Sequence, residues 1–131
     1  MNLSTYLANK LTNAVLRNVA YTLPTTVYLH LYTSDPTKDD TGTEVSDTTG
    51  YAAQAVTFAA AVDGICENSG DIEFPVATAD QGIITHGGIR DNTDNLLWFG
   101  PLSSVQTVKL GAQLKFLANS IRVGFSTTPC S

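Results

Sequence analysis

The stretch GIITHGGIRDNTDNLLWFGPL, residues 82–102, decides the fold that this sequence predicts. It holds two apolar segments, residues 83–91 and 95–102, separated by Asn-Thr-Asp at residues 92–94. Asn and Asp tolerate positive φ angles and hydrogen-bond to their own backbone, which suits a tight reversal of the chain. The Leu-Leu-Trp-Phe run at residues 96–99 is apolar on both faces, as expected for a strand that is covered on both sides. The stretch therefore predicts a β-hairpin at the centre of a β core.

Two adjacent glycines, Gly87 and Gly88, interrupt the first arm of this hairpin. Neighbouring glycines inside a strand are typical of a β-bulge or of a place where another part of the chain approaches closely. His86 precedes them, and we expect a buried imidazole hydrogen-bonded to backbone rather than a ligand for a bound group.

The composition predicts one domain that spans residues 1–131 and carries few charges. Hydrophobic residues make up 43% of the 131 residues and charged residues only 15%, so we expect part of the surface to lie against partners. The net charge is −5, and the seven Lys and Arg residues are scattered along the chain. Because there is no basic patch, we expect neither nucleic-acid binding nor binding to an anionic membrane.

The ends of the chain and its two cysteines bear on the compartment. No apolar run approaches the roughly 20 residues that span a bilayer, and the first 18 residues lack the continuous apolar region of a signal peptide. Without such a signal we expect Cys66 and Cys130 to be free thiols in a protein made in the cytoplasm. One bridge that ties the C-terminal tail to the body remains the alternative.

Residues 2–18 predict one amphipathic helix. Its apolar positions fall four residues apart: Leu3, Leu7, Leu11 and Val15. Asn2 or Ser4 suits the N-cap, and Asn18 suits a left-handed position at the end. Two interpretations stay open: the helix lies against its own sheet, or it is an arm that docks on a neighbouring subunit.

Residues 26–33 alternate with a period of two, which predicts a strand. The aliphatic face should point into the core: Val27, Leu29 and Leu31. The opposite, semi-polar face should meet solvent or another subunit: Tyr28, His30 and Tyr32. We expect His30 to be a packed, hydrogen-bonded residue rather than a metal or cofactor ligand.

An acidic loop follows at residues 38–50. Its carboxylates are Asp39, Asp40, Glu44 and Asp47. Their spacing matches no calcium-binding loop, so no metal site is predicted. We expect a solvated acidic loop, and contact with a partner is the use that its length favours.

The rest of the chain predicts further short strands. These are expected at residues 51–58, 59–65, 71–74, 105–110, 112–117 and 121–125, with turns at Asp63-Gly64 and Gly111. Short strands at fairly even spacing are typical of an antiparallel β-sandwich or barrel. The prediction is a mainly β protein with a β body at residues 26–126, one N-terminal helix and a loose tail at residues 127–131.

A search for chemistry finds no catalytic motif. The sequence lacks G-x-S-x-G, H-E-x-x-H, C-x-x-C and a P-loop. His30, His86 and Cys66 could converge in space, but their isolated positions do not favour an active site. We therefore predict a protein that is not an enzyme and has no catalytic residues, cofactor or bound metal.

Several stretches together resemble a family of small virion proteins of tailed bacteriophages. They are the N-terminal helix, VYLHLYTSDPT at 27–37, GTEVSDTTGYAAQAVTF at 42–58, NSGDIEFPVATADQGIITHGGIRD at 68–91 and NLLWFGPL at 95–102. Members are labelled capsid cement or decoration proteins, or tail-fibre proteins. The resemblance covers nearly the whole chain, although Ala53 stands where basic residues are common and Gln81 where an aromatic residue often precedes the glycine.

The resemblance implies a structural role in the virion. We expect a cement protein on the capsid exterior that binds the major capsid protein of the same phage, bridges capsomers and forms a homo-oligomer, a dimer or a trimer. The alternative is a tail-fibre or baseplate protein that faces the host receptor. The expected partner interface comprises Leu3, Leu7 and Leu11 of the helix, Tyr28, His30 and Tyr32 of the first strand, and Asp39, Asp40 and Glu44 of the acidic loop.

Overall fold

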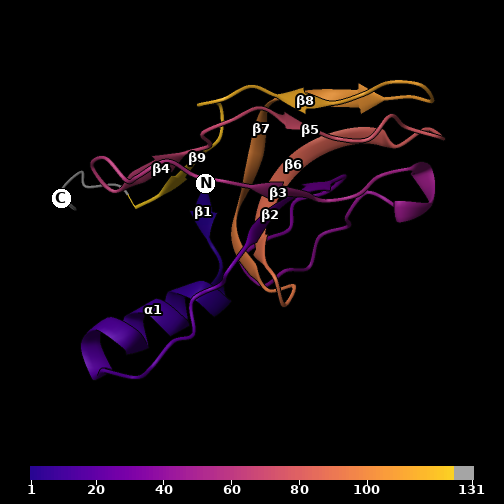
Figure 1. Cartoon of the computed structure of the whole chain (residues 1–131). Coiled ribbons are helices and arrows are strands. Elements are labelled where there is room, and N and C mark those ends of the chain that lie inside the picture. Colours follow the sequence, from indigo (N-terminus) through magenta and orange to yellow (C-terminus); the bar gives the residue numbers. More distant parts are fainter. Residues whose placement is uncertain (126–131) are drawn as a thin grey trace.

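A five-stranded antiparallel sheet forms the body of the protein (Figure 1). The computed structural model describes residues 1–125. In spatial order the strands are β1 (Asn2–Leu3), β7 (Leu96–Val108), β6 (Gly82–Asp91), β2 (Val27–Tyr32) and β3 (Gln54–Val56). The predicted hairpin supplies β6 and β7, which occupy the middle of this order, so the stretch at residues 82–102 does form the centre of the sheet.

Two small antiparallel pairs complete the β structure. One pairs β5 (Ile72–Glu73) with β8 (Lys115–Phe116), and the other pairs β4 (Ile65–Glu67) with β9 (Arg122–Gly124). In Figure 1 the β5–β8 pair lies along the top of the molecule, while the β4–β9 pair extends to the left as an arm. The prediction of a mainly β, sandwich-like fold with antiparallel strands and one helix is therefore confirmed.

The reversal between β6 and β7 is built by the Asx chemistry that the sequence predicts. The carboxylate Oδ1 of Asp91 accepts hydrogen bonds from the backbone N–H groups of Thr93 (2.9 Å) and Asn95 (2.8 Å). Asp94 adopts a left-handed conformation with φ of 66°. Both features are those expected of Asp in a tight turn.

Strand β7 is longer than predicted. The sequence suggests that Pro101 ends one strand and that another begins at residue 105, but β7 runs without interruption from Leu96 to Val108. The register between β6 and β7 shifts between Ile84 and His86, and Pro101 pairs with His86 next to that irregularity. A proline has no N–H to give to the ladder, and a bulge is one of the few places where a strand accepts it.

Of the two glycines in β6, Gly88 is the one that another part of the chain approaches closely. A Cβ atom at Gly88 would lie 2.9 Å from Cε2 of Tyr32 and 3.0 Å from Cδ1 of Leu96. A Cβ at Gly87 would meet no atom closer than 3.6 Å. The predicted close approach is thus confirmed at Gly88, where the neighbouring β2 places the tyrosine ring over the glycine.

The one α-helix of residues 1–125, α1 (Thr5–Arg17), begins later than the predicted residue 2, and a short 3-10 helix lies at Asp47–Thr49. Residues Asn2 and Leu3 pair with β7 instead, and Ser4 is the N-cap, its Oγ accepting the N–H of Leu7 at 3.1 Å. Asn18 ends the helix with φ of 53°, as predicted. Only the start of α1 lies against the sheet, and the rest projects away from it (Figure 1).

The remaining strands are shorter than the sequence patterns suggest. β3 covers only part of residues 51–58, and β4 begins where the segment 59–65 was expected to end. The turn at Asp63-Gly64 is confirmed, with φ angles of 54° and 82°. Pattern alone cannot separate a paired strand from extended loop, since both alternate polar and apolar residues. The predicted loose tail at 127–131 and the alternative Cys66–Cys130 bridge both involve residues outside the described part of the chain.

Candidate interaction surface

The helical residues expected at a partner interface face the protein's own body. Leu7 is only 3% exposed and belongs to the core. Leu3 and Leu11 are half-buried and pack against the same core, and Leu3 is also paired with Trp98 of β7. The first half of α1 therefore lies on its own sheet, which agrees with the first of the two interpretations offered by the sequence.

The semi-polar face of β2 is divided between surface and interior. Tyr28 and His30 are half-buried, whereas Tyr32 is 1% exposed. Burial raises the pKa of Tyr32 to about 12, although its hydroxyl accepts a hydrogen bond from Nη1 of Arg90 at 2.8 Å. Tyr32 thus contacts its own chain rather than solvent, because an arginine on the adjacent strand gives its hydroxyl a partner.

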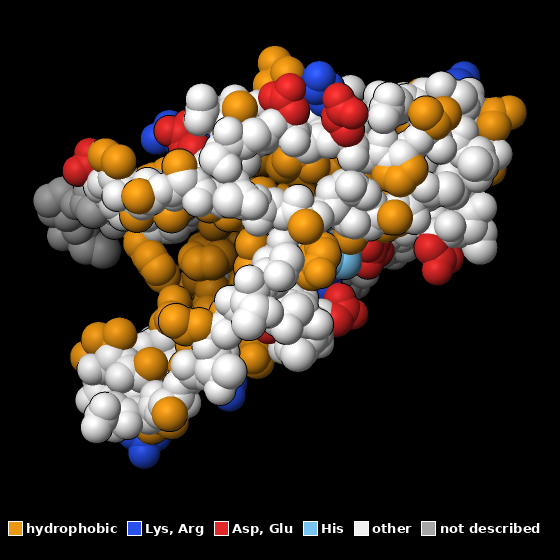
Figure 2. Space-filling model, in the orientation of Figure 1, with side chains coloured by type: hydrophobic (Ala, Val, Ile, Leu, Met, Phe, Trp, Pro, Cys, Tyr) orange, Lys and Arg blue, Asp and Glu red, His pale blue; other side chains and the backbone are white. Residues whose placement is uncertain are grey.

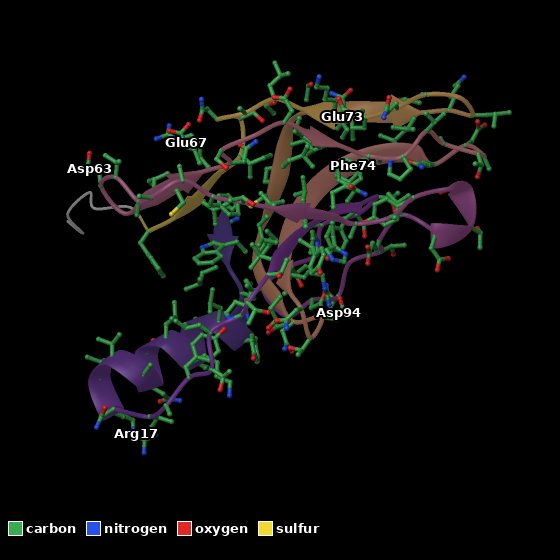
Figure 3. All side chains as sticks on the ribbon, in the orientation of Figure 1. Arg17, Asp63, Glu67, Glu73, Phe74 and Asp94 are labelled. Carbon is green, nitrogen blue, oxygen red and sulfur yellow. The ribbon has the colours of Figure 1, made fainter. Side chains whose placement is uncertain are left out.

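Arg90 is the centre of a cluster that ties the acidic loop to the hairpin. Its guanidinium makes a bidentate ion pair with Asp40, at 2.8 and 2.7 Å, and its Nε lies 2.8 Å from Oδ1 of Asp94. Nη2 also donates to the backbone oxygen of Asp94 at 2.8 Å. Figure 3 labels Asp94 at the turn of the hairpin. The hydrogen bonds to Asp40 raise the pKa of Arg90 above its ordinary value, so the guanidinium of Arg90 stays positively charged.

A second polar cluster fixes the end of the same loop. Oε2 of Glu44 lies 2.6 Å from Nδ1 of His30 and accepts the hydroxyl proton of Tyr51 at 2.7 Å. The Tyr51 hydroxyl in turn accepts the N–H of Leu31 at 3.0 Å. Burial alone would raise the pKa of Glu44, but the hydrogen bonds from His30 and Tyr51 outweigh it and the pKa is lowered. His30 is therefore packed and hydrogen-bonded, as predicted.

The acidic loop is solvent-accessible at all four carboxylates, as expected, but two of them are also bonded to the body of the protein. Asp40 and Glu44 are held by the two clusters just described. Asp39 and Asp47 are exposed, and Asp39 pairs only with its neighbour Lys38, at 2.9 Å. No local pattern indicates these bonds, because the partners of Glu44 and Asp40 lie 14 and 50 residues away along the chain. The loop is thus a fixed surface feature of the body.

A different surface, which the sequence patterns did not reveal, is an apolar groove that is open to solvent. A groove of about 390 Å³ lies beneath the β4–β9 arm, and we call it the apolar notch. Its principal lining residues are Val27, Phe58, Cys66, Trp98, Val123 and Phe125. Figure 2 shows it as an orange hollow between the arm above and α1 below. The rings of Trp98 and Phe125 pack edge to face on its wall, with their centroids 5.9 Å apart.

The projecting half of α1 borders this notch. Val15 is 79% exposed and Leu16 is 76% exposed. Together with Leu11 they line a shallow depression that also includes Phe125, so the depression adjoins the notch. Large apolar side chains gathered on one surface are typical of an interaction site rather than of a free surface. One sequence signal was available, since Val15 continues the four-residue spacing that Leu3, Leu7 and Leu11 begin.

Of the residues considered for catalysis, His30 and His86 occupy nearby positions on the adjacent strands β2 and β6, whereas Cys66 lies on β4 in a separate strand pair. His30 is bonded to Glu44, His86 to Oγ1 of Thr85 at 2.7 Å, and Cys66 lines the notch. The prediction for His86 was wrong, because its imidazole is half-buried rather than buried and its partner is a side chain rather than backbone. Within residues 1–125 no three His, Cys, Asp or Glu side chains are grouped as metal ligands would be. The one helix of that region is too short and polar to cross a membrane.

Comparison with known families gives a match over nearly the whole chain. Residues 2–124 match the model of a family described as podophage GP4 fiber I protein gp80. No curated protein matches the chain significantly. The match supports the resemblance to phage virion proteins that the sequence motifs indicated.

Proposed function

The chain belongs to the podophage GP4 fiber I protein gp80 family, and we propose that it is a non-enzymatic structural protein of a phage virion, attached as a component of a fibre. The observation that carries the proposal is the family match itself, which extends over residues 2–124 and thus includes every strand and the helix. A structural role in a virion requires surfaces that hold neighbouring proteins rather than an active site.

The architecture supports such a role through its rigidity. The acidic loop is fixed at two points, by the ion pair of Arg90 with Asp40 and by the hydrogen bonds of Glu44. A loop that is ordered before binding loses little conformational entropy when a partner docks on it. The exposed carboxylates Asp39 and Asp47 give this loop a negative surface that suits a basic patch on another virion protein.

A second candidate function is capsid cement on the outside of the head. It is favoured by the form of the described residues, which make one β body and show no repeated elongated segment of the kind that builds long fibres. In this role the protein would bind the major capsid protein and bridge adjacent capsomers. A protein that binds the assembled shell stabilises it by mass action, as any ligand stabilises the state it binds.

Labelling of intact virions separates the two candidates. Gold-conjugated antibody against this protein, viewed by electron microscopy, should mark the tail region if the protein is a fibre component. Label spread over the head would reject the fibre proposal in favour of cement. Copy number from quantitative mass spectrometry gives an independent check, because a shell protein is present in far more copies than a fibre protein.

Removal of the protein provides a functional test. Virions that lack a fibre component should keep their heads intact on heating but bind host cells poorly. Virions that lack a cement protein should release DNA at a lower temperature than the wild type. Virions that lose neither property would reject both candidates.

A further inference from the structure

The N-terminal segment, residues 2–17, is held on the body of the protein by its first few residues. β1 pairs with β7, and the buried Ser4 donates its backbone N–H to the carbonyl oxygen of Leu97 at 2.9 Å. Leu7 enters the core and is 3% exposed, whereas Val15 near the far end of α1 is 79% exposed. The body therefore carries a docking surface that fits the start of this chain.

The linker, residues 18–26, returns from the far end of α1 to β2 and is weakly attached (Figure 1). Within residues 1–125, the backbone of residues 20–25 forms no hydrogen bond to another part of the backbone. Tyr21 packs against the core, but its buried hydroxyl has no hydrogen-bond partner within those residues. Because a buried polar group without a partner destabilises the conformation that buries it, this course of the linker is not held firmly in place.

We propose that two copies of this chain exchange their N-terminal segments, so that residues 2–17 of each copy dock on the body of the other. The docking surface fits Leu3, Ser4 and Leu7 in that order, and a second copy offers the same three residues. Each strand pair, hydrogen bond and apolar contact of the docking surface is kept in the exchange, which makes it a low-cost route to a dimer. When extended, residues 18–26 span about 30 Å, enough to cross to a neighbouring body.

Exchange also changes the surroundings of the linker. In a two-fold dimer both linkers pass between the two bodies, so they lie beside each other at the axis. Val19 and Leu23 of the linker are 46% and 69% exposed in the single chain. Their burial between the linkers adds an apolar contact that a single chain lacks, and a new course of the linker frees the hydroxyl of Tyr21. Both changes favour the dimer over the closed monomer.

This inference is independent of the place of the protein in the virion, because it concerns contacts between copies of the same chain. Its tests use the purified chain alone. Their failure would leave the fibre and cement proposals as they stand, and rejection of either proposal would leave the exchange unaffected.

A disulfide reports which body holds each N-terminal segment. Leu3 and Trp98 lie opposite each other in the β1–β7 pair, and Cα atoms in such a pair are roughly 4.5–5.5 Å apart, within the range that a disulfide joins. The double variant Leu3→Cys with Trp98→Cys, with both native cysteines replaced by serine, is oxidised in the native state and run unfolded on a non-reducing gel. Exchange joins the two chains, so most of the protein should run as a covalent dimer that reduction converts to monomer.

The matched control is Ile83→Cys with Thr107→Cys in the same serine background. These two residues are paired in the β6–β7 hairpin, and both are exposed. Since both belong to the body, their bridge should form within one chain and run as a monomer. If Leu3→Cys with Trp98→Cys also runs as a monomer, each segment is docked on its own body and the proposal is overturned.

A second experiment leaves the docking surface intact. Insertion of Gly-Ser-Gly-Ser between the exposed Thr22 and Leu23 lengthens the linker, which lets the segment fold back on its own body with less constraint. Sedimentation equilibrium should give the wild type twice the mass of one copy, and the insertion should raise the dissociation constant of the dimer by at least about tenfold. A monomeric wild type, or equal dissociation constants for the two chains, would overturn the proposal.

Discussion

The Arg90 cluster and the apolar notch lie on the same sheet, but they differ in whether their side chains find partners within the chain. Around Arg90 every polar group of the guanidinium has a partner within the chain, and the arginine side chain is only 9% exposed. Around the notch, by contrast, Phe125 is 49% exposed, and the neighbouring Val15 and Leu16 are 79% and 76% exposed. Within residues 1–125, one region has all its groups paired and the other leaves apolar surface exposed.

The difference separates residues that stabilise one folded chain from residues that are available for contact with other proteins. A completed polar cluster fixes the conformation of its loop, because any movement would leave a buried charge without its partner. An uncovered apolar surface adds little to the stability of one chain but contributes fully when another protein covers it. Substitutions in the two regions should therefore separate effects on folding from effects on association.

The largest expected effect comes from a pair of leucines at opposite ends of α1. Leu7→Ala should lower the free energy of unfolding by about 2–5 kcal/mol, since Leu7 is buried in the core. Leu16→Ala should change it by less than about 0.5 kcal/mol. Urea unfolding at a concentration where the chain is monomeric measures both. Equal losses would mean that the end of α1 belongs to the core of one copy.

The Arg90 cluster should give the next largest effect. Arg90→Ala removes the hydrogen bond to the buried Tyr32 hydroxyl and the ion pairs that hold the loop, with an expected loss of about 2–3 kcal/mol. Arg122→Ala is the control, because Arg122 is exposed and forms no ion pair within residues 1–125. A loss below about 0.5 kcal/mol for Arg90→Ala would place the cluster among ordinary surface ion pairs.

The two adjacent glycines test how tightly Tyr32 is held beside this cluster. Gly88→Ala should cost about 1–3 kcal/mol, because the new methyl group would meet the Tyr32 ring and Leu96 at about 3 Å. Gly87→Ala meets only ordinary contacts and should be close to neutral. Thermal unfolding of the two variants side by side measures the difference. A neutral Gly88→Ala would show that the ring is free to move.

The smallest effect is a pH dependence at Glu44. The folded pKa of Glu44 is lowered below its ordinary 4.5, so its contribution to stability is present above that pH and is lost as the pH falls through the folded pKa. Because the side chain is about one third exposed, the contribution is about 0.5 kcal/mol. Glu44→Gln should therefore lose less stability than the wild type between pH 6 and pH 3. Parallel pH profiles of urea unfolding would contradict this.

The sequence predicted the local features of the fold well, because they are encoded by neighbouring residues. The hairpin turn, the Ser4 and Asn18 caps and the Asp63-Gly64 turn all depend on side chains that act within a few residues. The continuity of β7 through Pro101 was missed, since it depends on a bulge in the opposite strand. The lengths of the short strands β3, β5, β8 and β9 were overestimated, because pairing is decided by a partner far away in the chain.

The candidate site was harder to predict than the fold. Arg90 lies 50 residues from Asp40, and only tertiary structure brings them together. The notch is assembled from residues that each looked like ordinary strand positions, such as Phe58, Trp98 and Val123. Neither region is marked by a sequence motif, because packing and ion pairing across a fold impose no fixed spacing between the residues involved.

The short strand β1 has a mechanical consequence. Strand pairing attaches the start of the chain to β7 at Asn2 and Leu3, and Ser4 adds hydrogen bonds to the backbone of Leu96 and Leu97. β6 and β7, by contrast, are paired over most of ten residues. A pulling force applied through α1 would therefore separate β1 from β7 while the β6–β7 hairpin stayed paired.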